Sequence, residues 1–250
     1  MKKIGIVIQA RIGSSRLPGK MTLPFYNDFT LLDVILDKFK QVSKEIPVIV
    51  ATTENVKDDV IVNCAKKHNL ISFRGDEQNV LARFVAAAEN NEIDVVVRVC
   101  ADNPFLSIRF INNIIEAFKQ KEVEYVSYKN EKGMPTIRTH YGFFAELVKL
   151  STLKKIETLT EEKIYQEHVT NFIYSNPHLF QLNLLDIPFS ENDKVRLTID
   201  TREDFDLAQH IYSELMHSKG NVEPETVMAY LEEHPEYLYL MYEQINAQKK

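Results

Sequence analysis

Short apolar stretches rich in β-branched residues alternate with segments of helical periodicity along the first half of the chain. Such stretches lie at 2–8, 47–51, 71–73, 94–99 and 125–128, and each is predicted to form a strand. Between them, apolar residues recur at helical spacing in 31–42, 60–65, 79–88 and 107–120. This order predicts an α/β fold whose central sheet is mainly parallel, with helices on both faces.

The alternation breaks after residue 128. The pattern there predicts a polar turn at 129–133, strands at 137–141 and 181–187, and helices near 143–152 and 160–174. We therefore expect 1–250 to form a single domain that carries residues 129–190 as an α+β insertion. The rest of the chain predicts a strand at 194–199, a helix start at 201–204, and two further helical segments separated at His234-Pro235.

Composition narrows the class of protein. A net charge of −6 argues against general binding to nucleic acid. Cys64 and Cys100 provide neither a disulfide framework nor the spacing of a metal site, so both are expected in the core of a protein from a reducing compartment. The first apolar run is too short for a signal peptide or a membrane span. These features predict a cytoplasmic protein without a membrane or nucleic-acid partner.

The loop at 9–20, QARIGSSRLPGK, follows the first predicted strand and combines glycines, serines and cations. A loop in this position opens where α/β sheets bind their ligands. Arg11, Arg16 and Lys20 can neutralise a polyanion, while Gly13 and Ser14 allow close backbone approach and supply hydrogen bonds. The spacing excludes a P-loop and a dinucleotide-binding fingerprint. The loop therefore predicts a triphosphate cradle; an ordinary basic surface loop is the alternative.

Five motifs occur in the order expected for one enzyme family. They are Gln9-Ala10-Arg11-x-Gly13-Ser14-x-Arg16-Leu17-Pro18-Gly19-Lys20, Arg74-Gly75-Asp76 with Asn79-Val80-Leu81-x-Arg83, Ala101-Asp102-x-Pro104, Glu167-His168-Val169-Thr170 and Thr198-x-Asp200-Thr201. Together they resemble the cytidylyltransferases that make CMP-activated acidic sugars, most closely the branch for spore-coat polysaccharide synthesis. The resemblance implies transfer of CMP from CTP to an acidic acceptor in surface polysaccharide or glycan synthesis, with pyrophosphate release, and a homodimer that uses the insertion.

The resemblance also implies roles for single residues. The phosphates of CTP would be bound by the catalytic cations Arg11, Arg16 and Lys20, and other nucleotide contacts would come from Gln9, Ala10, Gly13 and Ser14. Arg74 and Asp76 would contact the base or the ribose, because family enzymes use the loop after this strand for that purpose. An ion pair between Arg74 and Asp76 that only shapes the turn is the alternative.

Asp102 and Asp200 each follow an apolar stretch, so the two carboxylates are expected to meet at one edge of the sheet. Mg²⁺ binds oxygen ligands and commonly takes only one or two protein carboxylates, with water and phosphates completing its octahedron. The pair therefore predicts a magnesium site, and the resemblance implies the same role. A turn-forming Asp102 and a helix-capping Asp200 are the alternatives.

The acceptor site is expected to differ from the family at 135–141. A Gly-Leu pair followed by acidic residues is expected there, whereas this chain has Arg138 and His140. Because arginine recognises phosphate, phosphonate and carboxylate groups through paired hydrogen bonds, we predict an anionic acceptor. Arg98, inside a valine run, and His168 are further acceptor-binding candidates. A carboxylate partner for Arg98 and a structural role for His168 are the alternatives.

Two other functions remain open from the sequence. A glycosyltransferase that uses a nucleotide-sugar also builds on an α/β sheet with a metal-binding aspartate, but it usually has an Asp-x-Asp pair, whereas Cys100 precedes Asp102 here. A non-catalytic nucleotide-binding subunit would bind nucleotide without turnover. Release of pyrophosphate from CTP in the presence of an acceptor separates the three functions.

Overall fold

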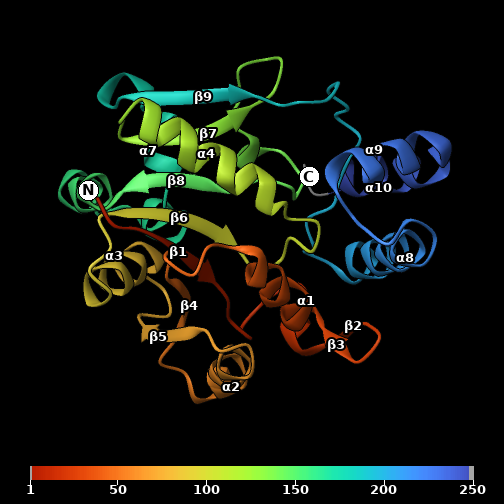
Figure 1. Cartoon of the computed structure of the whole chain (residues 1–250), viewed down its shortest axis with the longest axis horizontal. Coiled ribbons are helices and arrows are strands. Elements are labelled where there is room, and N and C mark those ends of the chain that lie inside the picture. Colours follow the sequence, from red (N-terminus) through yellow and green to blue (C-terminus); the bar gives the residue numbers. More distant parts are fainter. Residues whose placement is uncertain (1, 248–250) are drawn as a thin grey trace.

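A seven-stranded sheet forms the centre of the molecule (Figure 1). The computed structural model describes residues 2–247. The strand order is β5 (Ile71–Gly75), β4 (Val48–Thr53), β1 (Ile4–Gln9), β6 (Val95–Cys100), β8 (Glu146–Lys149), β7 (Tyr125–Lys129) and β9 (Leu182–Asp186). Neighbouring strands pair in parallel, except that β8 is antiparallel to both β6 and β7. The predicted, mainly parallel sheet is confirmed.

Helices cover both faces of the sheet, because alternate residues of a strand point to opposite sides. On β1, Ile6 and Ile8 belong to one apolar cluster and Val7 to another. The first cluster includes residues of α1 (Leu31–Lys38), α2 (Asp59–Lys67), α4 (Ile108–Gln120), α8 (Arg202–Lys219), α9 (Pro224–Glu233) and α10 (Pro235–Ala247). The second includes residues of α3 (Val80–Asn90), α5 (Leu150–Leu159) and α7 (Asn171–Ser175). A small hairpin, β2 (Pro24–Tyr26) and β3 (Phe29–Thr30), precedes α1.

Three helices begin at capping residues that the sequence marks. Thr30 and Thr201 each form a capping box with an aspartate three residues further on, Asp33 and Asp204 respectively. The Asn79 side chain accepts a hydrogen bond from a backbone N–H in the first turn of α3. The predicted helix starts are confirmed at all three positions because a cap depends only on residues close in sequence.

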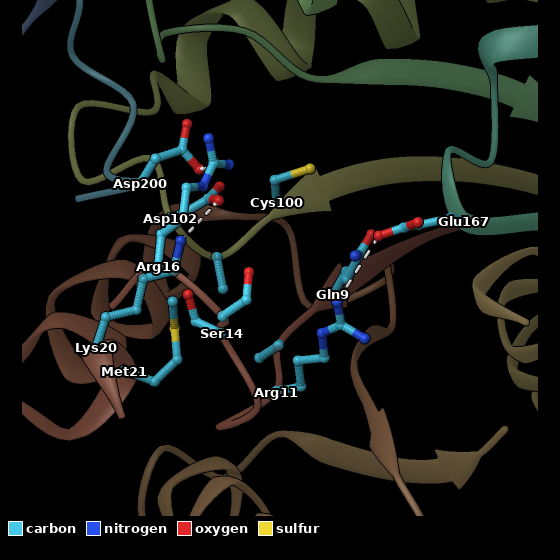
Figure 2. A pocket seen from close by; sticks show the side chains of 13 residues that line it. Gln9, Arg11, Ser14, Arg16, Lys20, Met21, Cys100, Asp102, Glu167 and Asp200 are labelled. Carbon is cyan, nitrogen blue, oxygen red and sulfur yellow. Dashed lines mark hydrogen bonds and ion pairs between the residues drawn. The ribbon is translucent and has the colours of Figure 1, made fainter. Parts of the chain in front are cut away.

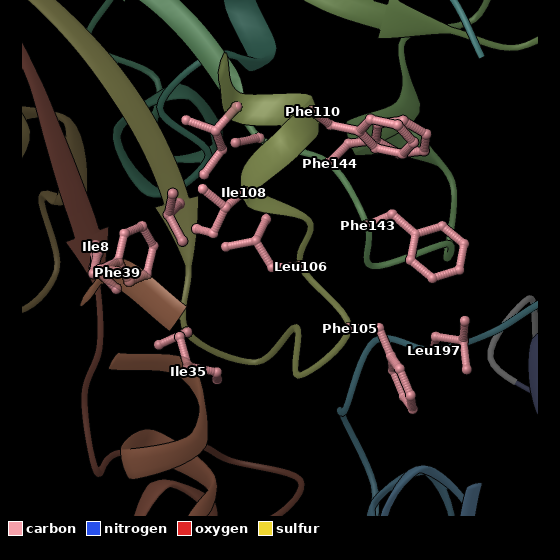
Figure 3. Packing of buried hydrophobic residues seen from close by; sticks show 14 of the residues in the cluster. Ile8, Ile35, Phe39, Phe105, Leu106, Ile108, Phe110, Phe143, Phe144 and Leu197 are labelled. Carbon is pink, nitrogen blue, oxygen red and sulfur yellow. The ribbon is translucent and has the colours of Figure 1, made fainter. Parts of the chain in front are cut away.

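The loops that carry the predicted carboxylates are held by buried apolar side chains. Phe105 follows Asp102, and Leu197 and Ile199 precede Asp200; each of these three apolar residues is at most 1% exposed. All three belong to the larger apolar cluster, part of which Figure 3 shows. Burial of this kind fixes the backbone on which the polar residues stand.

Three predicted elements of the middle region differ in the structure. Residues 137–141 form no strand; a 3-10 helix at Thr136–Arg138 leads into irregular backbone. The helix predicted at 143–152 is β8 followed by α5, and the helix predicted at 160–174 is two short helices, α6 (Lys163–Glu167) and α7. Apolar residues in segments this short fit a strand period and a helix period equally well.

The strand predicted at 194–199 is a segment without regular secondary structure that hydrogen-bonds to loops. The N–H of Leu197 donates to the carbonyl of His140 at 2.7 Å, and the N–H of Ile199 donates to the carbonyl of Asp102 at 3.0 Å. Within residues 2–247 the segment joins no sheet. A buried segment needs apolar residues whichever backbone it pairs with, so its sequence pattern resembles that of a strand. The second bond places Asp200 next to the loop after β6.

Residues 129–190 contribute β8 and β9 to the central sheet, together with α5, α6 and α7. The expectation that this segment forms a dimer interface stays a prediction, and sedimentation of the purified protein would test it. No helix within residues 2–247 combines the length and the apolar character needed to cross a membrane.

Candidate active site

A cavity opens at the carboxyl ends of β1 and β6 (Figure 2). The residues that line it are Gln9, Ala10, Arg11, Ser14, Ser15, Arg16, Lys20, Met21, Cys100, Ala101, Asp102, Glu167 and Asp200. The structure therefore brings the cations of the first loop and both predicted metal carboxylates to one cavity, although they come from three distant parts of the chain.

Lys20 is buried at the edge of this cavity and contacts a predicted metal ligand. Gly19 precedes it with a φ of 72°, a left-handed conformation that favours glycine. Lys20 Nζ lies 3.1 Å from Asp102 Oδ2 and donates to the carbonyl of Ile199 at 2.5 Å. Since Lys20 is only 7% exposed, its ammonium is a fixed positive charge beside the cavity.

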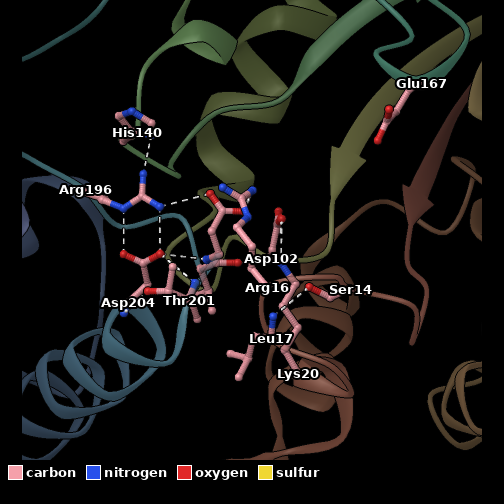
Figure 4. A network of polar contacts seen from close by, with 12 residues as sticks. Ser14, Arg16, Leu17, Lys20, Asp102, His140, Glu167, Arg196, Thr201 and Asp204 are labelled. Carbon is pink, nitrogen blue, oxygen red and sulfur yellow. Dashed lines mark hydrogen bonds and ion pairs between the residues drawn. The ribbon is translucent and has the colours of Figure 1, made fainter. Parts of the chain in front are cut away.

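Asp200 is held by two arginines from different segments, Arg16 and Arg196, both labelled in Figure 4. Arg16 donates to Oδ1 at 2.8 Å, and Arg196 donates to Oδ2 at 3.1 Å. The fully buried Arg196 side chain also forms a two-bond pair with Asp204, at 2.7 and 2.8 Å, and donates to His140 Nδ1 at 2.9 Å. Arg196 therefore orients Asp200 and connects it to the segment that carries His140.

The two carboxylates fit Mg²⁺ in donor type and in access. The side chains of Asp102 and Asp200 are 31% and 23% exposed and border the same cavity. Carboxylate oxygens are ligands that Mg²⁺ prefers, and the ion leaves several coordination positions to water and phosphate. Asp102 and Asp200 could therefore hold a magnesium ion together, with Lys20 and Arg16 beside it to bind phosphate oxygens.

Arg11 and Gln9 border the side of the cavity nearest Glu167. Arg11 donates to the carbonyl of Glu77 at 3.3 Å, and its other terminal nitrogen lies 4.0 Å from a Glu167 carboxylate oxygen (Figure 2). The side-chain oxygen of Gln9 is buried and accepts no hydrogen bond from any described residue. A buried acceptor of this kind is stabilised when a ligand donates to it.

The first loop is folded by its own backbone and by one carboxylate beneath it. The N–H groups of Ser14 and Gly19 both donate to the carbonyl of Ile12, at 2.8 and 3.2 Å. The N–H of Ile12 donates to Asp58 Oδ1 at 2.8 Å, and Asp58 Oδ2 accepts from Thr52 and Thr53. Asp58 therefore ties the loop to the end of β4. Asp58 is not among the site residues predicted from the sequence.

Asp58→Asn is expected to lower the free energy of unfolding by about 3 kcal/mol at pH 7, because an amide nitrogen then faces donors that need an acceptor. Burial raises the pKa of Asp58, but the hydrogen bonds from Thr53, Ile12 and Thr52 outweigh it and leave the pKa below its ordinary value. This contribution is complete above the unfolded pKa of about 3.9 and is lost as the pH falls through the folded-state pKa.

Urea unfolding of wild type and Asp58→Asn between pH 7 and pH 3 measures this effect. The difference between the two proteins should shrink as the medium becomes more acidic. The exposed Asp28→Asn is the matched control and should follow wild type throughout. A difference that is constant with pH would contradict an ionised, stabilising Asp58.

A second cavity adjoins the first. It is lined by Arg98, Cys100, Asp102, Asn103, Ile137, Arg138, Thr139, His140, His168, Thr170, Tyr174, Thr198 and Asp200. Cys100, Asp102 and Asp200 border both cavities. The four predicted acceptor-binding residues, Arg98, Arg138, His140 and His168, are thus brought together on the other side of the two carboxylates.

Arg98 both meets a carboxylate and borders the second cavity. Its guanidinium donates to Glu146 Oε2 at 2.6 Å, and Glu146 also accepts from Thr170 and Tyr125. Burial lowers the pKa of Arg98, while Cys100 and Glu146 raise it, and the net shift is upward. The Nε of Arg98 and the side-chain oxygens of Asn103 and Thr198 are buried without a hydrogen-bond partner among the described residues. This cavity therefore retains polar groups suited to a polar ligand.

Arg74 is the last residue but one of β5 and Asp76 directly follows the strand, and neither borders the two cavities in the described part of the chain. Arg74 donates to the carbonyls of Thr53 and Asn55, both at 3.2 Å, and pairs with Asp59. Asp76 accepts from two backbone N–H groups at 2.7 Å, which lowers its pKa. For Arg74 and Asp76 to contact the base or the ribose, the nucleotide must therefore extend beyond these two cavities.

Comparison with known proteins identifies the family to which this chain belongs. The family model for cytidylyltransferases matches residues 5–245, nearly the whole chain. The chain belongs to the cytidylyltransferase family. It is 31% identical over 220 residues to the spore coat polysaccharide biosynthesis protein SpsF of Bacillus subtilis, covering 85% of this chain and 87% of that protein.

Two solved structures of cytidylyltransferases share the fold. One, from Leptospira borgpetersenii, is 28% identical, has a TM-score of 0.82, and covers 95% of this chain and 97% of its own. The other is a CMP:2-keto-3-deoxy-manno-octonic acid synthetase complexed with CTP, at 15% identity and a TM-score of 0.64 over 84% of this chain and 98% of its own. The fold of this cytidylyltransferase family member is thus established by its neighbours as well as by its topology.

Sequence reasoning missed several polar residues that shape the site of this family member. Arg196 and Glu146 are buried ionic residues, at 2% and 2% exposure, and their roles depend on partners in other segments. The sequence does contain one signal for Arg196: it stands between two apolar residues, in Val195-Arg196-Leu197. A buried arginine requires a charged partner, so this position could have been identified as part of an ionic network. Glu167 was recognised within a motif but not as a cavity residue.

Proposed function

We propose that this protein transfers CMP from CTP to an acidic acceptor, of the ulosonic acid, phosphonate or phosphate type, and releases pyrophosphate. The observation that carries the proposal is the meeting of two cavities at Asp102 and Asp200, one with the cations of the first loop and the other with Arg98 and Arg138. Family membership supports the choice of cytidine. The relative from Bacillus subtilis supports a role in surface polysaccharide synthesis.

Different residues would bind the two substrates. Arg11, Arg16 and Lys20 would bind the triphosphate and neutralise the charge that accumulates as pyrophosphate departs. Asp102 and Asp200 would hold Mg²⁺, which supplies further charge neutralisation and aligns the phosphates when bound. The acceptor oxygen would attack the α-phosphorus from the second cavity, in line with the departing pyrophosphate, so the rate depends mainly on positioning and electrostatics.

His140 fits recognition of an anion. Its Nδ1 accepts a hydrogen bond from Arg196, so a neutral imidazole carries its proton on Nε2 and is a donor there. Arg138 lies on the same short segment, with its guanidinium 6.0 Å from the ring of Tyr174. The acceptor would therefore present a carboxylate, phosphonate or phosphate to this segment.

Pyrophosphate release tests the proposed function. Each of the four nucleoside triphosphates is offered with Mg²⁺ and one of three acceptors: a 3-deoxy ulosonic acid, a phosphonate or a sugar phosphate. We expect release only with CTP and one acidic acceptor, together with a CMP conjugate detected by mass spectrometry. Turnover of a nucleotide-sugar without use of CTP would indicate a glycosyltransferase, and CTP affinity without turnover would indicate a non-catalytic subunit.

Arg138→Ala is expected to raise the KM for the acceptor about 10–100-fold and to leave the KM for CTP within about twofold. The loss of a charge-assisted contact to an anion costs about 1.5–3 kcal/mol, and 1.4 kcal/mol corresponds to tenfold. Steady-state kinetics with each substrate varied in turn measures both constants. Arg109→Ala, on α4 and paired with Glu225, is the matched control. An unchanged acceptor KM would remove Arg138 from the acceptor site.

A further inference from the structure

Two pairs of potential metal ligands face each other between α1 and α2. Asp33 and Asp37 are four residues apart on α1, and Cys64 lies four residues before His68, which directly follows the last residues of α2. Residues at this spacing lie on one face of a helix. His68 Nε2 lies 2.8 Å from Asp33 Oδ1, and Cys64 Sγ lies 3.5 Å from the same oxygen.

We propose that Asp33, Cys64 and His68 form a binding site for a borderline transition-metal ion of the Zn²⁺ class. One ligand atom from each residue lies within 4.8 Å of the other two. Tetrahedral zinc with bonds of about 2.0–2.3 Å separates its ligand atoms by roughly 3.3–3.7 Å. The separations of 2.8 and 3.5 Å from Asp33 Oδ1 therefore require shifts of up to about half an ångström, and the ligand atoms of Cys64 and His68, within 4.8 Å of each other, would move closer by up to about 1 Å.

The surroundings of the three ligands suit a metal. Asp33 and His68 are buried, with side chains 6% and 5% exposed, while Cys64 is half-buried. The second oxygen of Asp33 accepts from the backbone N–H and the hydroxyl of Thr30, which fixes the carboxylate. Asp37 Oδ1 lies 3.9 Å from His68 Nδ1 and pairs with Lys40, so a small side-chain shift would bring it to hydrogen-bond distance, from which a carboxylate orients a ligating imidazole.

In the absence of a metal, the Lys67 ammonium provides the positive charge beside Asp33. Its ammonium lies 2.9 Å from Asp33 Oδ1, and its side chain is 59% exposed. A metal ion would displace this ammonium into solvent at little cost and leave a fourth coordination position for water. The same geometry without a metal is a hydrogen-bonded link between the two helices, and the experiment below distinguishes the two.

The site is separate from the cavity that holds Asp102 and Asp200, and the inference does not depend on the proposed function. α1 follows the first loop and the β2–β3 hairpin, while α2 directly follows Asp58, the residue that anchors Ile12. A metal that joins α1 to α2 would therefore stabilise the support of the first loop. Its expected effect is on folding and thermal stability.

Cobalt binding tests the site. Protein freed of metal with a chelator is titrated with Co²⁺, which gives a thiolate-to-cobalt charge-transfer absorption only when a cysteine is a ligand. We expect the charge-transfer band to account for one ion per chain, to disappear when Zn²⁺ is added, and to be lost in Cys64→Ser. Cys100→Ser is the control for cobalt at the other cysteine and should keep the band. No band in wild type, or a band that persists in Cys64→Ser, would overturn the proposal.

A second set of variants covers the case in which a ligand variant does not fold. Lys67→Ala removes an exposed competing cation and should bind Zn²⁺ about 3–10-fold more tightly by competition with a chromophoric chelator. Asp37→Asn should weaken binding about tenfold, the lower end of the loss for an outer-shell partner. Lys66→Ala is the matched control, since it is exposed on the same helix. Equal Zn²⁺ affinity in wild type, Lys67→Ala and Asp37→Asn would leave only the hydrogen-bonded link.

Discussion

Lys20→Ala is expected to lower the kcat of nucleotidyl transfer by about 10²–10³-fold, the typical loss when one preorganised charge-stabilising donor is removed. Lys20 is held by Asp102 and the carbonyl of Ile199, so its ammonium needs no reorganisation when charge develops on the phosphates. An interaction stronger in the transition state than in the bound substrate changes kcat more than KM. The KM for CTP should therefore change much less than kcat.

The structural cost of this substitution has to be measured separately. Removing Lys20 leaves the carbonyl of Ile199 and one oxygen of Asp102 without this donor, which should lower the free energy of unfolding by about 1–3 kcal/mol. Circular dichroism and urea unfolding show whether the variant remains folded at the assay temperature. Lys44→Ala, at an exposed loop position, is the control. A folded Lys20→Ala protein with wild-type turnover would refute the role of Lys20.

Asp102→Asn should have a comparable effect through the metal. The substitution keeps the shape of the side chain and removes its charge, so the affinity for a divalent cation should fall and the Mg²⁺ activation curve should move to higher concentration. At a fixed Mg²⁺ concentration that saturates wild type, we expect a loss of about 10²–10³-fold in turnover. Activity measured over a range of Mg²⁺ and of Mn²⁺ gives both quantities.

The same experiment separates two roles of Asp102. If Asp102 only positions Lys20, Asp102→Asn should lower kcat without any shift of the metal activation curve. If it binds the metal, the curve should shift, and added metal should restore part of the rate. Asp186→Asn, an exposed aspartate at the end of β9, is the control and should match wild type. An unshifted curve would contradict the assignment of Asp102 as a metal ligand.

The elements that sequence patterns predicted well are those governed by residues close in sequence. The β-branched run of β1 specifies a buried strand, and the Thr30–Asp33 and Thr201–Asp204 capping boxes specify helix starts. The predictions failed where apolar residues are buried for another reason. The segment at 194–199 is apolar because it is covered, while its backbone partners are His140 and Asp102 in loops.

The proposed metal site likewise depends on contacts between residues far apart in sequence. The spacing of Cys64 and Cys100 indicates no metal site, and a search for a ligand set along the sequence passes over Cys64 and His68. Only the packing of α1 against α2 places Asp33 within 3.5 Å of Cys64 and 2.8 Å of His68. Ligands contributed by two separate helices leave no continuous motif.

The sequence alone determined the α/β class, the basic first loop and the two aspartates, because strand periodicity, glycine placement and charge type are local properties. The tertiary structure decided how these parts combine. It brought Lys20 to Asp102 and Arg16 to Asp200, and it showed that Asp200 is oriented by the buried Arg196. Each of these contacts depends on where the backbone folds back on itself, which is set by packing of the whole core and is not encoded in any short stretch of residues.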